Sequence, residues 1–496
     1  MPKRRHEIFE TDHLRDDLGG RSVRGGAITL GAQALKFLLQ TTSTIVLARL
    51  LLPEDFGLVA MVMVVVGFAS VFKDMGFSWA TVQSPRVTHE QVSTLFWINL
   101  AIAVVLTGAL VVASPYVADI YDEPRLVAIG MALSLTFLFH GLSAQHLALL
   151  RRQMRYGAIA VVELVSMGTA IGAGILIAWQ DGMYWALVTV QLVTPATAAL
   201  LAWMLSPWKP GLPRRRSGIR SMVAFGSHLT GFSFLNYFTR QADNALIGYF
   251  AGATQLGLYT KAYNLFQMPM RQMNTPLASV ALPALSRLQG DPAAYRRYYL
   301  RAVQGLAYLS VPTVALAAGI ADPLIPFVLG AQWAEAVPIF QLLAVGGVVT
   351  PILWTAGWVQ QSRGRTDRML RWSLLSDPIY VLSFVIGVRW GAIGVAAGFA
   401  IALHVLWLPT LAYAFRGTEL RVPMLLKHIY PALMMGMVAF TASFAVTRTV
   451  GLPDAALLLL AVLAALACAV LLFVVWPRFR QEVRGLVELR AHLRRR

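Results

Sequence analysis

The sequence predicts an all-α polytopic membrane protein with fourteen transmembrane helices. Long apolar segments with short connections follow one another along almost the whole chain, and a membrane span needs about 20 apolar residues. Only 13% of the 496 residues are charged and 57% are hydrophobic, whereas a soluble domain is about 25% charged. Basic residues also gather in every second connection. These observations exclude a soluble globular protein, and no connection is long enough for a folded extramembrane domain.

Each predicted span is an apolar run bounded by polar or turn-forming residues. The fourteen spans cover residues 23–50, 57–80, 91–114, 126–150, 156–178, 183–205, 219–250, 255–285, 297–319, 334–360, 369–388, 391–415, 424–447 and 454–476. Residues 1–22 are polar and mixed in charge, without the hydrophobic centre of a signal peptide. We therefore expect a cytosolic N-terminal tail.

The distribution of Lys and Arg predicts that both termini are cytosolic, because cytosolic loops of membrane proteins carry the basic excess. Besides the two tails, the basic residues concentrate around positions 86, 151–155, 209–220, 287–301, 363–371 and 416–427. The alternate loops hold few basic residues and several acids. The net charge of +18 therefore reports topology, and we predict no nucleic-acid partner.

An internal repeat predicts two similar lobes. The run ARLLLPEDFGLVA at 48–60 aligns with GYFAGATQLGLYT at 248–260, and each is a helix end, a short turn and a Gly-Leu pair entering the next helix. Two lobes around a site near the membrane midplane are a common transporter plan. The expected parts are an N-lobe at 23–205 with helices 1–6, a basic linker at 206–218, a C-lobe at 219–415 with helices 7–12, two further helices at 424–476, and a basic cytosolic tail at 477–496.

Polar residues form three stripes on otherwise apolar spans. They are Thr29, Gln33, Lys36, Gln40 and Ser43 on helix 1; Ser233, Asn236, Arg240 and Asp243 on helix 7; and Thr260, Asn264, Gln267, Arg271 and Asn274 on helix 8. Spacings of three and four residues place each set on one helix face. The polar residues of a stripe can hydrogen-bond with one another between packed helices, or they can line a water-filled cationic cavity. Ionisable groups inside the membrane favour the cavity.

Few acids lie inside the predicted spans, namely Asp74, Glu163, Asp243 and Asp377. Asp74 follows Lys73 and can pair with it. Asp243 can pair with Arg240 at a spacing of three residues. The last three acids are candidate ion-coupling residues, and a structural ion pair is an equally good interpretation of each.

Motifs for nucleotide and metal chemistry are missing from the sequence. It contains no GxxxxGK[ST] phosphate loop and no HExxH motif, and its one cysteine, Cys468, leaves no internal disulfide or thiol metal cluster. We predict no cofactor, no metal and no enzymatic activity.

Several runs resemble a known family. Residues 236–291 read NYFTRQADNALIGYFAGATQLGLYTKAYNLFQMPMRQMNTPLASVALPALSRLQGD, with an Asp followed by IG, a turn, LGLY, an Ala-Tyr pair and a PALSRLQ close. Together with ARLLLPEDFGLVAM, FKDMGFSWATVQ and LLRRQMRYGAIAVVELVS, this run is similar to the Wzx-like oligosaccharide flippases, the polysaccharide-transporter family of the multidrug/oligosaccharidyl-lipid/polysaccharide exporter superfamily. The resemblance covers at least residues 25–400.

The resemblance implies fourteen helices in two V-shaped lobes and a flippase of the bacterial cytoplasmic membrane. Its substrate would be a polyprenyl-diphosphate-linked oligosaccharide for exopolysaccharide, capsule or O-antigen assembly. Expected partners are this lipid, the bilayer, and the polysaccharide polymerase and export machinery. Candidate substrate-binding residues are Lys36, Gln40, Asn236, Arg240, Asn264, Gln267 and Arg271. Arginine suits this role because its fork binds phosphate oxygens bidentately and stays charged when buried.

Three alternatives remain at this point. A small-molecule exporter of the same fold would be expected to prefer an acidic or aromatic cavity for cations. A flippase for a lipid-linked peptidoglycan precursor would share the diphosphate chemistry. A membrane glycosyltransferase or polymerase usually needs a sizeable outer loop, which the predicted spans do not leave room for.

Overall fold

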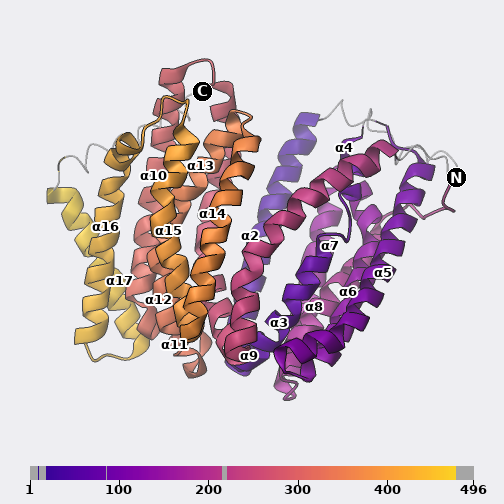
Figure 1. Cartoon of the computed structure of the whole chain (residues 1–496), viewed down its shortest axis with the longest axis horizontal. Coiled ribbons are helices and arrows are strands. Elements are labelled where there is room, and N and C mark those ends of the chain that lie inside the picture. The colour runs from indigo at the N-terminus through magenta and orange to yellow at the C-terminus, as the bar shows by residue number, and fades with distance from the viewer. Residues whose placement is uncertain (1–8, 10–17, 85, 215–219, 476, 478–496) are drawn as a thin grey trace. The chain divides into compact units, whose positions relative to one another are not determined.

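The computed structural model describes residues 9, 18–84, 86–214, 220–475 and 477. Most of both predicted tails, part of the basic linker at 206–218, and the side chains of Ser233 and Asn236 lie outside the described residues. Within the described part, the chain folds into helices without a β-strand (Figure 1). The all-α prediction is confirmed for this part.

A helix, a half of a helix or a pair of helices covers each predicted span. The first half of the chain forms α2 (Leu18–Leu50), α3 (Pro53–Ser70), α4 (Phe77–Gln83), α5 (His89–Tyr121), α6 (Arg125–Arg152), α7 (Tyr156–Trp179), α8 (Tyr184–Leu205) and α9 (Arg220–Arg287). The second half forms α10 (Pro292–Gly319), α11 (Ala321–Leu329), α12 (Ala336–Gly347), α13 (Thr350–Ser362), α14 (Thr366–Gly387), α15 (Gly391–Phe415), α16 (Val422–Thr449) and α17 (Asp454–Val475). Two short 3₁₀ helices occupy Ala331–Trp333 and Val388–Trp390.

Nine helical segments of the described chain are long and apolar enough to cross a membrane, and ten if the pair α12–α13, bent by 41°, counts as one span. One of the nine joins α14 and α15. The helices α2 and α9 are not among them, and these are the helices that carry the predicted polar stripes. The chain is a multi-pass membrane protein, and the count of fourteen spans stays a prediction.

The predicted span at 57–80 is interrupted in the structure. The helix ends at Ser70 and resumes at Phe77. Between them Met75 and Gly76 have φ values of 43° and 71°, in the left-handed region that interrupts an α-helix. The backbone N–H of Ser78 then bonds to the carboxylate of Asp74, which satisfies a donor at the start of α4.

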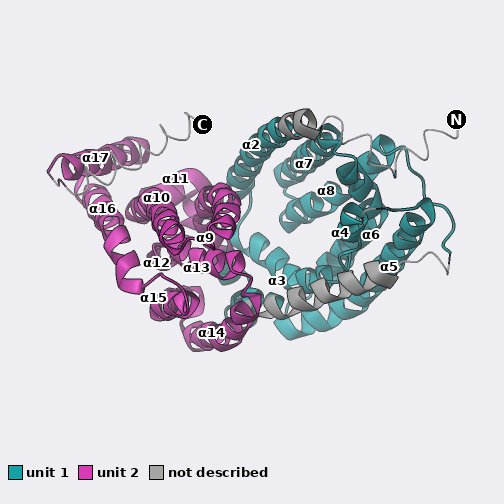
Figure 2. Cartoon of the chain, turned by 90° about the horizontal axis from the view of Figure 1, so that it is seen from above, with its two compact units in different colours: residues 1–257 teal, residues 258–496 magenta. Residues whose placement is uncertain are grey.

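The chain divides into two compact units, Met1–Gly257 and Leu258–Arg496 (Figure 2). The division falls inside α9, five residues after the kink at Gly252, where φ is 80° and ψ is 178°. Unit 1 pairs α5 with α6, α7 with α8, and α2 with α7. Unit 2 pairs α10 with α16 and α14 with α15, and α16 also packs against α17. The lobe division at the linker stays a prediction.

The two copies of the predicted repeat, at 48–60 and 248–260, contact each other inside unit 1. A Cβ atom added to Gly57 would lie 1.7 Å from the carbonyl oxygen of Ala253, and one added to Gly257 would lie 1.8 Å from that of Pro53. These are reciprocal contacts, because each partner is displaced by the same 200 residues. Only glycine permits such a backbone approach at either position. The Gly-Leu signature of the repeat therefore forms a pseudo-twofold crossing between the start of α3 and the turn of α9.

Candidate functional site

The stripe on α2 is exposed toward the N-terminal end of the helix and buried toward the C-terminal end. Thr29, Gln33 and Gln40 are exposed, Lys36 is half-buried, and Ser43 is buried. The helix α2 packs lengthwise against α7, so the stripe occupies a face that is only partly covered.

Lys36 forms an ion pair with Glu163 of α7, with 3.4 Å between Nζ and Oε2. The sequence analysis predicted Lys36 as a substrate-binding residue and Glu163 as an ion-coupling residue. It did not predict that the two residues contact each other. Their side chains are 39% and 42% exposed. Lys36 lies about 21 Å below the end of α2 at Leu50, and Glu163 about 24 Å below the end of α7 at Trp179, at 1.5 Å per residue. On the predicted topology, in which both helices span the membrane, both depths lie within a hydrocarbon core of about 30 Å.

A half-exposed ion pair at this depth indicates a surface in contact with water, because placing a charged group in lipid costs free energy. An exposed pair of this kind is worth only about 0–1 kcal/mol. The ammonium of Lys36 can therefore exchange Glu163 for a stronger anion.

Arg240 stands in unit 1 on the first half of α9. It is exposed, and within the described residues it makes no hydrogen bond or ion pair. The predicted pairing of Arg240 with Asp243 is absent from the described structure. Asp243 is buried, 7% exposed, and accepts a hydrogen bond from the N–H of Asn244 at 2.8 Å. The two side chains have different environments although they are one helical turn apart.

The stripe in unit 2 forms a ladder along the second half of α9. Arg271 Nε donates to Gln267 Oε1 at 3.1 Å, and Gln267 Nε2 donates to Tyr263 Oη at 2.7 Å. The ring of Tyr263 stacks on Tyr259 and meets the edge of Phe399, with ring centroids 6.0 and 6.1 Å apart. The ladder fixes the guanidinium through Nε, so its two terminal nitrogens remain for an anion.

The remaining predicted residues of unit 2 lie near this ladder or on its helix. Asn264 is exposed on α9. Asp377 of α14 is partly buried and accepts a hydrogen bond from the Ser376 hydroxyl at 3.4 Å. Tyr380, one turn further along α14, packs on Phe399 with ring centroids 6.4 Å apart. Phe399 thus contacts both the helix of Asp377 and the helix of Arg271.

A buried polar cluster at the break between α3 and α4 was missed in the sequence. Asp74 accepts hydrogen bonds from the Ser78 hydroxyl at 2.8 Å and from Asn99 Nδ2 at 3.3 Å. Lys73 makes no ion pair with it in the described structure. Asn99 is fully buried, and its Oδ1 has no hydrogen-bond partner among the described residues. The signal was the Asp-x-Gly sequence with Ser four residues after Asp, which is typical of a turn and a helix start.

Within the described residues no group of three or more His, Cys, Asp or Glu side chains could hold a metal ion. The stripes on α2 and α9 offer cationic and hydrogen-bonding surfaces. Such surfaces can bind an anionic, hydroxyl-rich ligand.

Comparison with known proteins gives a consistent family. The profile of a family described as "Polysaccharide biosynthesis protein" matches residues 46–338. The chain is 27% identical over 385 residues to the teichuronic acid biosynthesis protein TuaB of Bacillus subtilis (strain 168), covering 76% of this chain and 79% of the relative. It is 25% identical over 363 residues to the lipopolysaccharide biosynthesis protein WzxC of Escherichia coli (strain K12), covering 72% and 73%.

Among solved structures, the fold is similar to that of the lipid II flippase MurJ in an inward closed conformation. The TM-score is 0.68 at 15% identity, and the match covers 91% of this chain and 99% of the other. This likeness shows that the two chains share a fold.

Proposed function

Because the chain belongs to the polysaccharide biosynthesis protein family, we propose that it is a flippase for a polyprenyl-diphosphate-linked oligosaccharide. The lipid moves from the cytosolic to the outer leaflet of the bacterial cytoplasmic membrane, where exopolysaccharide, capsule or O-antigen is assembled. Transport follows alternating access in a protein of fourteen spans and two lobes with both termini in the cytosol. The chain performs no sugar transfer itself.

The observation that carries this proposal is the presence of exposed or half-exposed cations on two otherwise apolar helices, α2 and α9. A bare diphosphate cannot cross hydrocarbon, since burial of an isolated charge costs tens of kcal/mol in the Born limit. Lys36 and Arg240 in unit 1, and Arg271 in unit 2, can each replace water around phosphate oxygens. The prenyl tail can remain in the lipid throughout.

The proposed roles follow from the geometry of each side chain. Arg271, held by Gln267, presents its terminal nitrogens to one phosphate. Arg240 is unpaired in the described structure and can bind bidentately. Lys36 adds a point charge once it leaves Glu163. Neutral side chains then suit sugar hydroxyl groups, and they are Gln40, Asn236, Asn264 and Gln267.

The absence of a nucleotide motif in the sequence favours an ion gradient, the membrane potential or downstream consumption as the energy source. Asp243, Asp377 and Glu163 are the proposed ion-coupling residues. Asp243 is buried, whereas Glu163 is already engaged by Lys36. This difference makes Asp243 and Asp377 the first residues to test for coupling.

Reconstitution tests the proposed function directly. The purified chain is placed in liposomes with a polyprenyl-diphosphate oligosaccharide, and the lipid that reaches the outer leaflet is measured with a membrane-impermeant sugar-modifying reagent. We expect translocation above that of protein-free liposomes and a loss with Arg271→Ala. Absence of translocation by the folded wild-type chain would falsify the proposal.

The fold shared with a lipid II flippase favours one second candidate, a flippase for a lipid-linked peptidoglycan precursor. Both substrates present a diphosphate, so the arginines do not separate them. The same liposomes loaded with the peptidoglycan precursor provide the comparison. If that precursor moves faster than every oligosaccharide lipid tested, the result would support the second candidate and contradict the first.

A further inference from the structure

A cavity of about 450 Å³ opens between the beginnings of α10 and α16, entirely within unit 2. It is lined by Arg296, Arg297, Leu300, Arg301, Met424 and His428. None of these residues belongs to the stripes on α2 and α9. The cavity is therefore separate from the surface proposed to bind the transported lipid.

Close packing of α10 and α16 fixes the two walls of the cavity. A Cβ atom on Gly436 would lie 2.7 Å from Val311 Cγ1, and one on Gly319 would lie 2.0 Å from Ser443 Oγ. The contacts advance in the same direction along both helices, so α10 and α16 run parallel. Nearer the cavity, Leu300 belongs to the same buried cluster as Leu425. Both helices thus begin at the same end of the unit.

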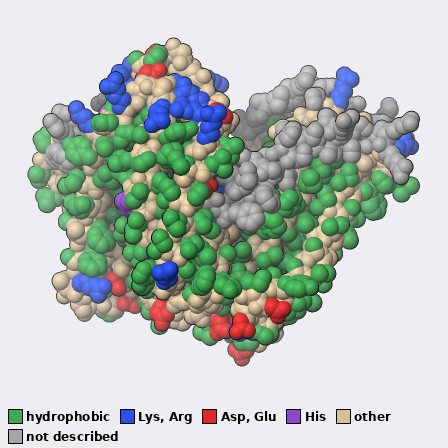
Figure 3. Space-filling view, in the orientation of Figure 1, with side chains coloured by type: hydrophobic (Ala, Val, Ile, Leu, Met, Phe, Trp, Pro, Cys, Tyr) green, Lys and Arg blue, Asp and Glu red, His purple; other side chains and the backbone are tan. Residues whose placement is uncertain are grey.

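The position of the cavity matches the level of lipid headgroups. Arg297 lies about 8 Å and Arg301 about 14 Å from the start of α10, and His428 about 9 Å from the start of α16, at 1.5 Å per residue. The concentration of basic residues predicts that this end faces the cytosol. Several Lys and Arg side chains, with a few acids beside them, lie at the upper end of unit 2 in Figure 3.

The three arginines of the cavity are not neutralised by described residues. Arg296, Arg297 and Arg301 make no hydrogen bond or ion pair in the described structure. Arg297 and Arg301 are four residues apart on one helix face, where like charges repel. An anion between α10 and α16 would relieve this repulsion.

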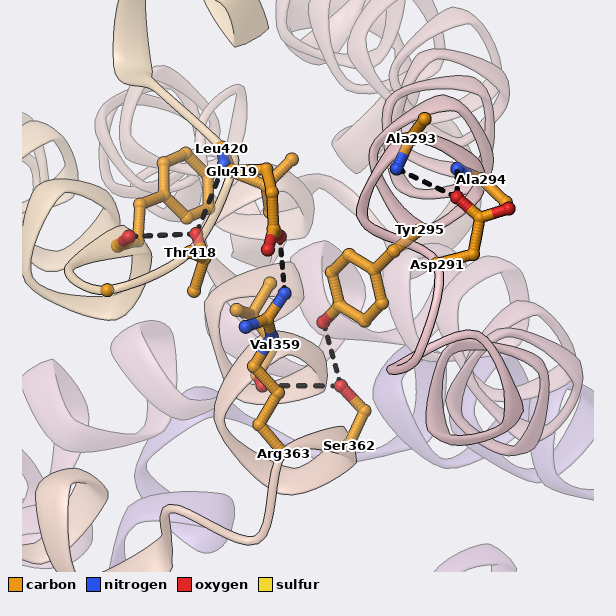
Figure 4. Close-up of polar contacts among 12 residues, drawn as sticks. Asp291, Ala293, Ala294, Tyr295, Val359, Ser362, Arg363, Thr418, Glu419 and Leu420 are labelled. Atoms are coloured by element: carbon orange, nitrogen blue, oxygen red, sulfur yellow. Dashed lines mark hydrogen bonds and ion pairs between the residues drawn. The ribbon is translucent and has the colours of Figure 1, made fainter.

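Acids at the same end of the unit are engaged elsewhere. Asp291 caps α10 by accepting hydrogen bonds from the N–H groups of Ala293 and Ala294, and Glu419 forms an ion pair with Arg363 (Figure 4). Arg363 in turn lies over the ring of Tyr295, 4.5 Å from its centroid. This network fixes the beginning of α10 and leaves the neighbouring cavity cationic.

An arginine of unit 1 shows how acids neutralise a guanidinium in this protein. Arg125 forms ion pairs with both Glu54 and Glu123. Its side-chain hydrogen bond lowers the pKa of Glu123, which lies in the connection between α5 and α6. Among the described residues the cavity arginines have no equivalent carboxylates, so a bound anion can supply their counter-charge.

We propose that this cavity binds the phosphate of an anionic glycerophospholipid from the cytosolic leaflet. Basic pockets between membrane helices on the cytosolic side suit such headgroups. Leu300 and Met424 add apolar wall. The same two helices expose Leu309 and Met434 further along their length, which suits acyl chains. The inference rests on the predicted topology and not on the identity of the transported lipid.

The test compares two triple variants of the full chain with equal loss of charge. Arg296→Gln, Arg297→Gln and Arg301→Gln remove the cavity charges. Arg287→Gln, Arg371→Gln and Arg421→Gln remove exposed arginines outside the cavity at the same predicted side. Each protein is placed in phosphatidylcholine nanodiscs with graded phosphatidylglycerol, and the enrichment of phosphatidylglycerol around the protein is measured by mass spectrometry.

We expect phosphatidylglycerol binding to fall on the order of 10- to 100-fold in the cavity variant, because it loses charge-assisted hydrogen bonds to the lipid phosphate. The control loses only general surface attraction, so its binding should fall far less. Millimolar inorganic phosphate should leave the binding unchanged. Equal losses in both variants would show diffuse surface attraction and overturn the site. Displacement by inorganic phosphate would show a soluble-anion site and overturn the lipid.

Folding of the variants is checked by the thermal unfolding midpoint. If the triple cavity variant is not stable, Arg301→Gln alone serves, because this side chain is exposed and has no described partner. Its binding should fall about fivefold or more, because one guanidinium no longer donates hydrogen bonds to the lipid phosphate. Unchanged phosphatidylglycerol binding by Arg301→Gln would then contradict the proposal.

Discussion

The end of α2 and the matching part of α9 have the same burial pattern but different charges. Positions 43 and 243 are both buried, as are 47 and 247, while 49 and 249 are exposed. The exposed Gln40 of α2 corresponds to the exposed Arg240 of α9, and the buried Ser43 corresponds to Asp243. The duplicated segments have therefore kept their packing, whereas their ionisable groups have diverged.

This comparison separates residues that the packing of the helices requires from residues that can bind a ligand. The crossing of Gly57 and Gly257 requires glycine in both copies for a steric reason. The cations have no such constraint. Lys36 is paired with an acid of another helix, whereas Arg240 is unpaired in the described structure and Arg271 is held by a neutral amide. We infer that the cations of α9 contribute more to anion binding than Lys36 does.

The largest effect should come from breaking the shared crossing. Gly57→Ala and Gly257→Ala would each place a methyl group within 2 Å of a carbonyl oxygen, and overpacking of this kind costs about 1–3 kcal/mol or more. We expect both variants to lose most of their monodisperse protein in fluorescence-detected size exclusion. The control Gly31→Ala, with no atom near its Cβ position, should behave as wild type. A harmless Gly257→Ala beside a disruptive Gly57→Ala would contradict the twofold relation.

The next effect concerns the second half of α9. Arg271→Ala removes charge-assisted hydrogen bonds worth about 1.5–3 kcal/mol each, so flipping should fall on the order of 10- to 100-fold. Arg287→Ala, which removes an exposed arginine near the end of the same helix, is the matched control. Rates are measured in the liposome assay at equal protein density. Equal rates for Arg271→Ala and Arg287→Ala would remove Arg271 from the binding surface.

A conservative change then tests the fork of Arg240. Arg240→Lys keeps the charge but loses one of two parallel hydrogen bonds, so we expect flipping to fall about tenfold. If Arg240 served only to neutralise Asp243, lysine would restore function. Arg287→Lys is the control for the substitution itself. Near-normal export by Arg240→Lys and by Arg240→Ala at equal expression would exclude Arg240 as a substrate ligand.

Much of this fold was predictable because long apolar runs and basic connections are local signals. The helix ends of α7 and α15 fall within one residue of the predicted spans at 156–178 and 391–415. The Gly-Leu turn also revealed the repeat. The break before α4 was missed, because apolar residues on both sides of Lys73 and Asp74 hid a short turn.

The candidate site was harder to predict than the helices. The pair Lys36–Glu163 joins residues 127 positions apart, and only the packing of α2 on α7 brings them together. The predicted pair Arg240–Asp243 has the three-residue spacing at which helix side chains can reach each other. That spacing permits a contact but does not require one. Burial of Asp243 and exposure of Arg240 gave these residues separate environments. Spacing therefore located the stripes but not their contacts.

The smallest expected effect comes from Glu163→Gln, which tests whether the acid restrains Lys36. Without the carboxylate, Lys36 loses a competitor worth about 0–1 kcal/mol, so substrate affinity should rise by up to about fivefold. Lys36→Gln should lower affinity by a similar factor, and the double variant should match Lys36→Gln alone. Such non-additivity is what two groups in direct contact produce. If Glu163→Gln instead leaves affinity unchanged and abolishes the dependence of flipping on a proton or Na⁺ gradient, Glu163 is a coupling residue. In that case the 3.4 Å contact with Lys36 does not control substrate binding.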